Sequence, residues 1–115
     1  MEPTAPGAAQ RRNVLIVEDH ELTRYGLVMA LEERCGLCNV AESDNGKAAV
    51  DYVSGHPVDV ILMDIGLPVM DGIAATKAIK ANHPDTKVLM LTSHNDPEEV
   101  FASLAAGADA YCMKD

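Results

Sequence analysis

Val60-Ile-Leu-Met63, with Asp64 directly after it, is the stretch that decides the fold. Its residues are all apolar instead of alternating with polar ones, which is typical of a strand buried on both faces of a parallel sheet. Three further runs share this character, and a fifth, weaker and half polar, fits a sheet edge. The four are Val14–Val17, Val88–Leu91, Ala110–Met113 and the weaker Asn39–Glu42.

Helical patterns separate these runs. A fourth helix has the clearest start signal, because Asp96 can cap it and Pro97 fits its first position, and Gly107 is the matching stop. The other three are expected over Glu21–Arg34, over Gly46–Gly55 with Asn45 as a cap, and over Gly72–Asn82 with Asp71 as a cap. Strands that alternate with helices predict an α/β fold with a parallel sheet and right-handed crossovers.

The first helix is apolar on more than one side. Leu22, Tyr25 and Met29 fall on one face, whereas Leu27 and Leu31 fall roughly opposite. A helix of this kind should be covered by more than the sheet alone.

Composition bounds the class of protein. The chain has 115 residues, 48% of them hydrophobic, which fits one globular domain. Its formal net charge of −9 argues against binding nucleic acid or anionic lipid by itself and suits metal cations or basic partner surfaces. The apolar runs are only a few residues long, so none is expected to span a membrane.

The beginning of the chain indicates a flexible tail over residues 1–12, with no basic segment followed by an apolar one as in a secretory signal. Three cysteines, an odd number, do not make a disulfide framework. Together these features favour a cytoplasmic location.

Cys35 and Cys38 have the C-x-x-C spacing. A metal site would need two more ligands, and Cys112 is a buried strand residue by its pattern. A redox motif usually places its nucleophile at a helix N-terminus, whereas this pair lies at a helix C-terminus. The sequence therefore favours a packing role over a redox or metal role.

Polar residues follow four of the strands. Glu18-Asp19 follow the first run, Asp64 the third, Thr92-Ser93 the fourth, and Lys114 the last. Ligands of open α/β sheets bind at the carboxyl ends of the strands, so these residues should converge on one edge. Singly, each would more often be a cap or a solvated charge, but the ordered set is a much rarer coincidence.

This set suits phosphoryl chemistry. Three close carboxylates need a cation, and Mg²⁺ binds through one or two carboxylates together with phosphate oxygens. Lys114 and Thr92 offer the ammonium and the hydroxyl that an incoming phosphoryl group requires. Asp64 is the best nucleophile candidate, because aspartate can form an acyl phosphate.

The sequence resembles a two-component response regulator receiver domain from Asn13 to Asp115, and most closely the regulators with a LuxR-type helix-turn-helix output. The resemblance is carried by Val14-Leu-Ile-Val-Glu-Asp-His20, Asp59-Val-Ile-Leu-Met-Asp64, Leu67-Pro-Val-Met-Asp-Gly72, Leu91-Thr92-Ser93 and Gly107-Ala-Asp-Ala-Tyr-Cys-Met-Lys114. It implies a flavodoxin-like (CheY-like), doubly wound, five-stranded parallel sheet with strand order 2-1-3-4-5.

The resemblance also implies the roles of the site residues. Asp64 would accept a phosphoryl group from a sensor histidine kinase or a phosphotransfer protein. Glu18, Asp19, Asp64 and the backbone carbonyl of Gly66 would surround Mg²⁺.

The resemblance implies that three further residues would respond to the phosphoryl group. Thr92 and Lys114 would contact the phosphoryl oxygens, and Tyr111 is similar to the aromatic residue that turns inward when Thr92 moves. The outcome would be a switched partner or dimer surface, which would control transcription through an output domain absent from this chain.

Some positions depart from the commonest pattern of the family. Glu18 stands where aspartate is frequent, and Asp115 stands where many receivers have a proline. The resemblance places Gly66 and His94 at the two positions that tune the lifetime of the phosphoryl group in the family, and glycine offers no side chain for this.

The last departure concerns a helix that follows the fifth strand in receivers, because residues 13–115 end after that strand. The open face and the side of Glu21–Arg34 should then be bare, and we expect self-association through that face or poor stability.

Three other functions fit the sequence less well. A phosphatase of the haloacid-dehalogenase type needs Asp-x-Asp after the first strand, whereas the nucleophile candidate here follows the third. A receiver that binds partners without phosphorylation should have lost Asp64, Thr92 or Lys114, and all three are present. A flavodoxin-type electron carrier needs a phosphate-binding loop where this chain has Glu18-Asp19.

The scattered His20, His56, His83 and His94 fit solvated loops better than a ligand set.

Overall fold

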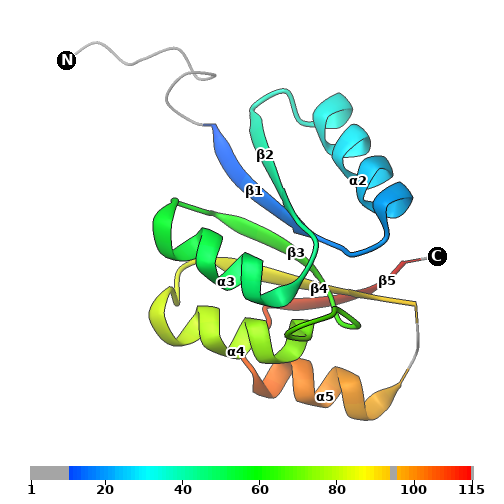
Figure 1. Ribbon diagram of the computed structural model, residues 1–115, viewed down its shortest axis with the longest axis vertical. Helices are drawn as coiled ribbons and strands as arrows, with labels where there is room; N and C mark the ends of the chain where they lie inside the picture. The colour runs from blue at the N-terminus through cyan, green and yellow to red at the C-terminus, as the bar shows by residue number, and fades with distance from the viewer. Residues whose placement is uncertain (1–10, 94–95, 115) are drawn as a thin grey trace.

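Five parallel strands form the centre of the molecule in the computed structural model, which describes residues 11–93 and 96–114 (Figure 1). Their order is β2-β1-β3-β4-β5, as the resemblance implied. The weakest predicted strand and the last one are the two edges. The strands are β1 (Arg12–Val17), β2 (Cys38–Ser43), β3 (Val60–Asp64), β4 (Lys87–Thr92) and β5 (Ala110–Met113).

Four helices connect the strands within the described residues, and each lies where the sequence pattern placed it. They are α2 (Glu21–Arg34), α3 (Gly46–Gly55), α4 (Gly72–Asn82) and α5 (Pro97–Ala105). The predicted caps are confirmed for Asn45, Asp71 and Asp96, because each side chain accepts a hydrogen bond from a backbone N–H of its helix's first turn. Gly107, just after the end of α5, has a φ of +107°, a backbone conformation that residues with a side chain rarely adopt.

The main core lies between the sheet and the helices α3 and α4, and α5 follows these helices along the same side of the sheet in Figure 1. Alternate residues of the central strands face these helices and are almost fully buried. They are Leu15 and Val17 of β1, Ile61 and Met63 of β3, and Val88 and Met90 of β4.

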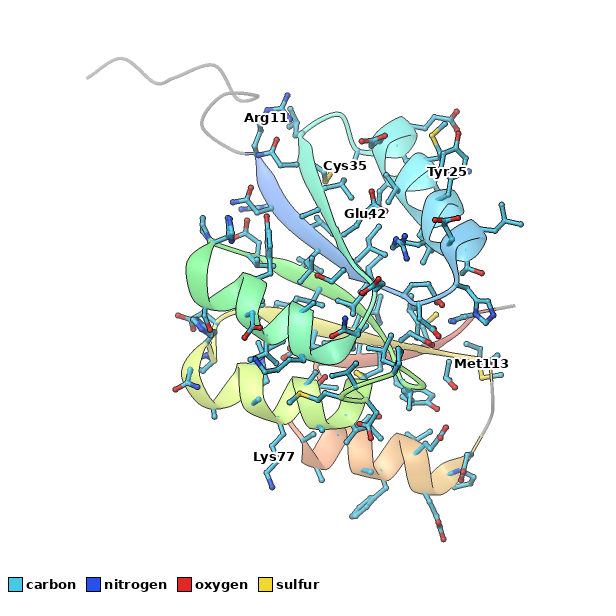
Figure 2. The ribbon with its side chains drawn as sticks, in the orientation of Figure 1. Arg11, Tyr25, Cys35, Glu42, Lys77 and Met113 are labelled. Carbon is cyan, nitrogen blue, oxygen red and sulfur yellow. A yellow bond between two sulfur atoms is a disulfide. The ribbon has the colours of Figure 1, made fainter. Side chains whose placement is uncertain are left out.

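The helix α2 lies alone on the other side of the sheet among the described elements (Figure 1). No residue of α2 is buried. Leu27 and Leu31 are half-buried, whereas Leu22 is 82%, Tyr25 61% and Met29 47% exposed. In Figure 2 the labelled Tyr25 points away from the sheet. The expectation of a bare apolar side on this helix is therefore confirmed.

Cys112 is exposed, so the expectation that it is buried is wrong. Its neighbour Tyr111 pairs with Met90 and packs against the main core. Because successive side chains of a strand point to opposite faces, Cys112 lies on the other face of the sheet, the face on which α2 lies. No described helix covers β5 on that side, and a continuous apolar run cannot indicate this from sequence alone.

Cys35 and Cys38 are joined in a disulfide, with their Cα atoms 5.6 Å apart. The expectation of a packing role alone is therefore wrong. Cys35 caps the C-terminus of α2, and the chain turns back through Gly36 and Leu37 so that Cys38 opens β2. This turn brings the two side chains together. The position of the pair at a helix C-terminus, which spoke against a redox motif, does not prevent a disulfide.

The strand β1 begins at Arg12, one residue inside the stretch predicted to be a tail. Residues 1–10 of that stretch lie outside the described residues. Among the helices that the structure describes, none has the length and apolar character needed to cross a membrane.

Candidate functional site

The predicted site residues meet at the carboxyl ends of β1, β3, β4 and β5. Asp64 and Thr92 are the last residues of β3 and β4. Glu18 directly follows β1 and Lys114 directly follows β5. Three of these residues, Asp64, Thr92 and Lys114, line a cleft of about 400 Å³ together with Asp19 and Gly66.

Lys114 joins two of the carboxylates. Its Nζ lies 2.6 Å from Oε1 of Glu18 and 2.9 Å from Oδ1 of Asp64. The side chains of Glu18 and Asp64 are only 1% and 11% exposed, whereas that of Lys114 is 23% exposed. A partly solvated ammonium group thus holds two nearly buried carboxylates in a fixed arrangement.

Backbone contacts fix the positions of these side chains. The N–H of Lys114 donates to the carbonyl of Thr92 over 2.8 Å, which keeps Lys114 beside the end of β4. The N–H of His20 donates to Oε2 of Glu18 over 3.0 Å. Glu18 therefore uses one oxygen for Lys114 and the other for the loop that carries Asp19.

Gly72 makes the close approach of α4 to the site possible. A Cβ atom at this position would lie 2.0 Å from the backbone oxygen of Asp64. The N–H of Gly72 donates to the carbonyl of Ile65 over 2.8 Å. Only a residue without a side chain lets α4 start directly against the end of β3.

The electrostatics distinguish the two buried carboxylates. Burial raises the pKa of Asp64 above its ordinary value, and the charges of Glu18 and Asp19 raise it further against the opposing effect of Lys114. Burial also acts to raise the pKa of Glu18, but the hydrogen bonds from Lys114 and the His20 backbone outweigh it and lower that pKa. The contacts with Lys114 and the backbone thus favour the ionised form of Glu18, whereas the surroundings of Asp64 disfavour its ionised form.

Lys114 responds in the expected direction. Burial acts to lower the pKa of its ammonium group, but the hydrogen bonds to Glu18 and Asp64 outweigh this and raise the pKa. Lys114 thus stays a cation at the floor of the site across the neutral range.

The donor set fits a hard cation. One ammonium faces three carboxylates, Glu18, Asp19 and Asp64, and the mutual repulsion appears in the raised pKa of Asp64. Ligand atoms of Glu18, Asp19 and His20 lie within 4.8 Å of one another. Carboxylate oxygens suit Mg²⁺, whereas the imidazole of His20 suits it poorly.

The two residues predicted to act as a switch lie on neighbouring strands. Thr92 is 2% exposed at the end of β4. Tyr111 is half-buried on β5, where it packs against the main core. His94 and Asp115, which the sequence also singled out, lie outside the described residues.

Sequence reasoning missed Arg24. Its Nη1 donates to the backbone carbonyl of Glu18 over 2.8 Å, and its Nε to Oε1 of Glu42 over 2.9 Å. Figure 2 shows Glu42, on β2, directed toward α2. Arg24 therefore ties α2 to the strand end that carries Glu18. A basic residue one turn into a largely apolar helix was the signal that could have indicated this.

Known proteins resemble this chain in sequence. The response regulator receiver domain family matches residues 14–115. The response regulator protein VraR of Staphylococcus aureus (strain Mu3) is 42% identical over 101 residues, which are 88% of this chain and 48% of that protein. The chain thus spans about half the length of the curated relatives it matches.

Solved structures resemble it in fold. The signal receiver domain of the putative response regulator NarL from Mycobacterium tuberculosis superposes with a TM-score of 0.85 at 36% identity, covering 91% of this chain and 85% of that one. A LuxR-family response regulator from Aurantimonas sp. SI85-9A1 also gives 0.85, at 28% identity, covering 92% and 76%. With the fold, the strand order and the matched residues in agreement, the chain belongs to the response regulator receiver domain family.

Proposed function

We propose that this chain is the phosphoacceptor of a two-component signalling system and that Asp64 takes the phosphoryl group. One observation carries the proposal: the Asp64 carboxylate lies in an open cleft, held by Lys114 and flanked by two further carboxylates. The donor would be a phosphohistidine on a sensor histidine kinase or a phosphotransfer protein.

The step is a displacement at phosphorus. A carboxylate oxygen of Asp64 attacks, the bond from phosphorus to the histidine nitrogen breaks, and the electron pair stays on the leaving imidazole. The ammonium group of Lys114 already contacts the attacking carboxylate. After the transfer it would contact the negatively charged phosphoryl oxygens. Glu18 holds Lys114 from the other side and so fixes its position.

Glu18, Asp19, Asp64 and the carbonyl of Gly66 would hold Mg²⁺. The ion would neutralise the negative charge that gathers when a phosphate approaches carboxylates. The exposed Asp19 and Gly66 lie where solvent reaches the cleft, whereas the buried Glu18 is committed to Lys114. Glu18 would therefore contribute its negative charge to the ion from a more deeply buried position than Asp19 and Gly66.

The phosphoryl group would change a surface through Thr92 and Tyr111. The Thr92 hydroxyl would be drawn toward the new negative charge, and the space it leaves would admit Tyr111. Tyr111 is half-buried, so an inward turn would remove its exposed part from the surface.

The relatives indicate the setting of this switch. They are response regulators, and one similar structure is RcsB of Salmonella enterica serovar Typhimurium bound to a promoter. We propose that this chain is the cytoplasmic input part of a transcription regulator whose DNA-binding part lies elsewhere. The net charge of −9 disfavours DNA contact by these residues. The chain acts in this proposal as a phosphorylated switch, not as an enzyme for a separate substrate.

Acetyl phosphate with Mg²⁺ tests the proposal. Intact-mass spectrometry should show one added phosphoryl group on the wild-type chain and none on Asp64→Asn. Asp59→Asn is the matched control, because Asp59 precedes β3 at its opposite end and should leave phosphorylation unchanged. An adduct that persists in Asp64→Asn, or that never forms on the wild type, would refute the assignment.

A further inference from the structure

We propose that Cys35 and Cys38 form a reversible dithiol–disulfide pair, separate from the phosphorylation site, which is oxidised by a low-molecular-weight disulfide such as glutathione disulfide. Their Cα atoms are 5.6 Å apart, within the range that a disulfide spans without backbone movement. They lie three positions apart in sequence, so closing the ring orders only a short segment.

Backbone hydrogen bonds hold the two cysteines near each other independently of the sulfur–sulfur bond. The N–H of Cys35 donates to the carbonyl of Leu31 over 2.7 Å, and that of Cys38 to the carbonyl of Cys35 over 3.3 Å. The carbonyl of Leu37 accepts from the N–H of Arg12 over 2.8 Å. The turn is thus attached to both α2 and β1, and it should keep the two thiols adjacent after reduction.

A small oxidant can reach the pair. Cys35 and Cys38 are half-buried, and between them Gly36 and Leu37 are exposed. Cys38 is the first residue of β2, whereas the site residues lie at the last residues of their strands or directly after them. Figure 2 shows Cys35 at the opposite end of the sheet from Met113, which directly precedes Lys114.

The chemistry balances with one molecule of glutathione disulfide. A thiolate of the pair attacks a sulfur of glutathione disulfide and expels one glutathione thiolate, which leaves a mixed disulfide. The second thiolate then attacks the protein sulfur and expels the other glutathione. Two electrons pass from the pair to glutathione, and the two protons lost by the cysteines are taken up by the two glutathione thiolates.

Oxidation should restrain α2. No residue of this helix is buried, and its Arg24 attaches the first half of the helix to Glu18 and Glu42. The disulfide adds a covalent link from the helix C-terminus to β2. The pair therefore sets how firmly the second half of α2 is held to the edge of the sheet.

Alkylation in glutathione buffers tests the pair. N-ethylmaleimide followed by intact-mass spectrometry counts free thiols, and the exposed Cys112 serves as an internal reference. With three cysteines in the chain, we expect three adducts in reducing buffer and one in oxidising buffer. Cys112→Ser should give two and none. Three adducts in every buffer, or only mixed disulfides with glutathione, would overturn the proposal.

Hydrogen exchange tests the consequence for α2. Oxidation should slow amide exchange in the last turn of the helix by roughly tenfold, because the link limits local opening. The buried strands β3 and β4 should not respond. In Cys38→Ser the same buffers should leave exchange unchanged. Equal exchange of oxidised and reduced wild type would contradict the restraint.

Discussion

At the scale of single residues, Asp64 carries its charge where charge is costly. It is nearly buried, and its pKa is raised by that burial and by the charges of Glu18 and Asp19. A carboxyl group whose pKa is raised by folding stabilises the protein most below its unfolded pKa, and this contribution is lost as the pH rises through the folded pKa. At neutral pH the ionised Asp64 therefore lowers the free energy of unfolding.

Asp64→Asn should raise the stability of the chain in the absence of Mg²⁺. The amide keeps an oxygen for Lys114 but removes the charge, and we expect a gain of about 1 kcal/mol at neutral pH, the scale of an ordinary substitution. The gain should shrink as the pH falls through the pKa of Asp64, where the wild-type carboxyl becomes neutral. Urea unfolding at a series of pH values measures it.

The exposed Asp85 provides the control for charge alone. Asp85→Asn should change the free energy of unfolding by much less, because solvent screens its charge. Added Mg²⁺ should reduce the advantage of Asp64→Asn, since a cation at the carboxylates stabilises the wild type. Equal effects of the two substitutions at every pH would contradict this view of the site.

At the scale of elements, Lys80 joins α4 to the start of β4 and to the segment before β5. Its Nζ donates to the carbonyl of Thr86 over 2.8 Å and to Oδ2 of Asp109 over 2.9 Å. The same Asp109 oxygen accepts from the N–H of Val88 over 2.9 Å. The side chain of Lys80 is only 15% exposed, so this contact is better shielded than an ordinary surface pair.

Lys80→Met should destabilise the protein by about 1–3 kcal/mol, because the carbonyl of Thr86 loses the Lys80 donor and the Asp109 carboxylate loses its charged donor and keeps the Val88 N–H. Lys77→Met is the matched control on the same helix, since Lys77 is exposed and points into solvent in Figure 2. Chemical denaturation measures both. A loss in Lys77→Met as large as that in Lys80→Met would show that helix charge, not the contact, is responsible.

Most elements could be predicted from the sequence, because their signals are local. Asn45 and Asp71 cap α3 and α4 as expected, and Gly107 follows the end of α5. The contacts that could not be predicted depend on how elements pack. Arg24 finds Glu42 on β2, and the turn between α2 and β2 brings Cys35 to Cys38.

The candidate site was predictable in its members but not in its internal contacts. The end of each strand indicated which residues would meet. The spacing gave no sign that Lys114 joins Glu18 as well as Asp64, because that depends on strand order and on the reach of a buried glutamate.

At the scale of the whole molecule, the two sides of the sheet differ. The side that faces α3, α4 and α5 contains the main core, whereas α2 stands alone among the described helices on the other. Leu22, Tyr25 and Met29 of α2 are all exposed, and so is Cys112 of β5 on that side of the sheet. Apolar patches of this kind indicate an interface.

We expect the chain to self-associate through this patch. Sedimentation velocity under reducing conditions should show a concentration-dependent rise in mass, and Leu22→Lys should weaken it. Phe101→Lys is the control, because Phe101 is 75% exposed on α5. A monomer at all concentrations with a sharp, high-temperature melt would contradict the expectation.

Locating the phosphoryl group tests the central claim most directly. The wild-type chain would be treated with acetyl phosphate and Mg²⁺ and then reduced with borohydride, which converts an aspartyl phosphate to homoserine. Tandem mass spectrometry of the peptide that contains Asp64 should find the conversion at that position, and a sample without Mg²⁺ should show little of it. Conversion at another acidic residue, or none in a phosphorylated sample, would contradict the assignment of Asp64.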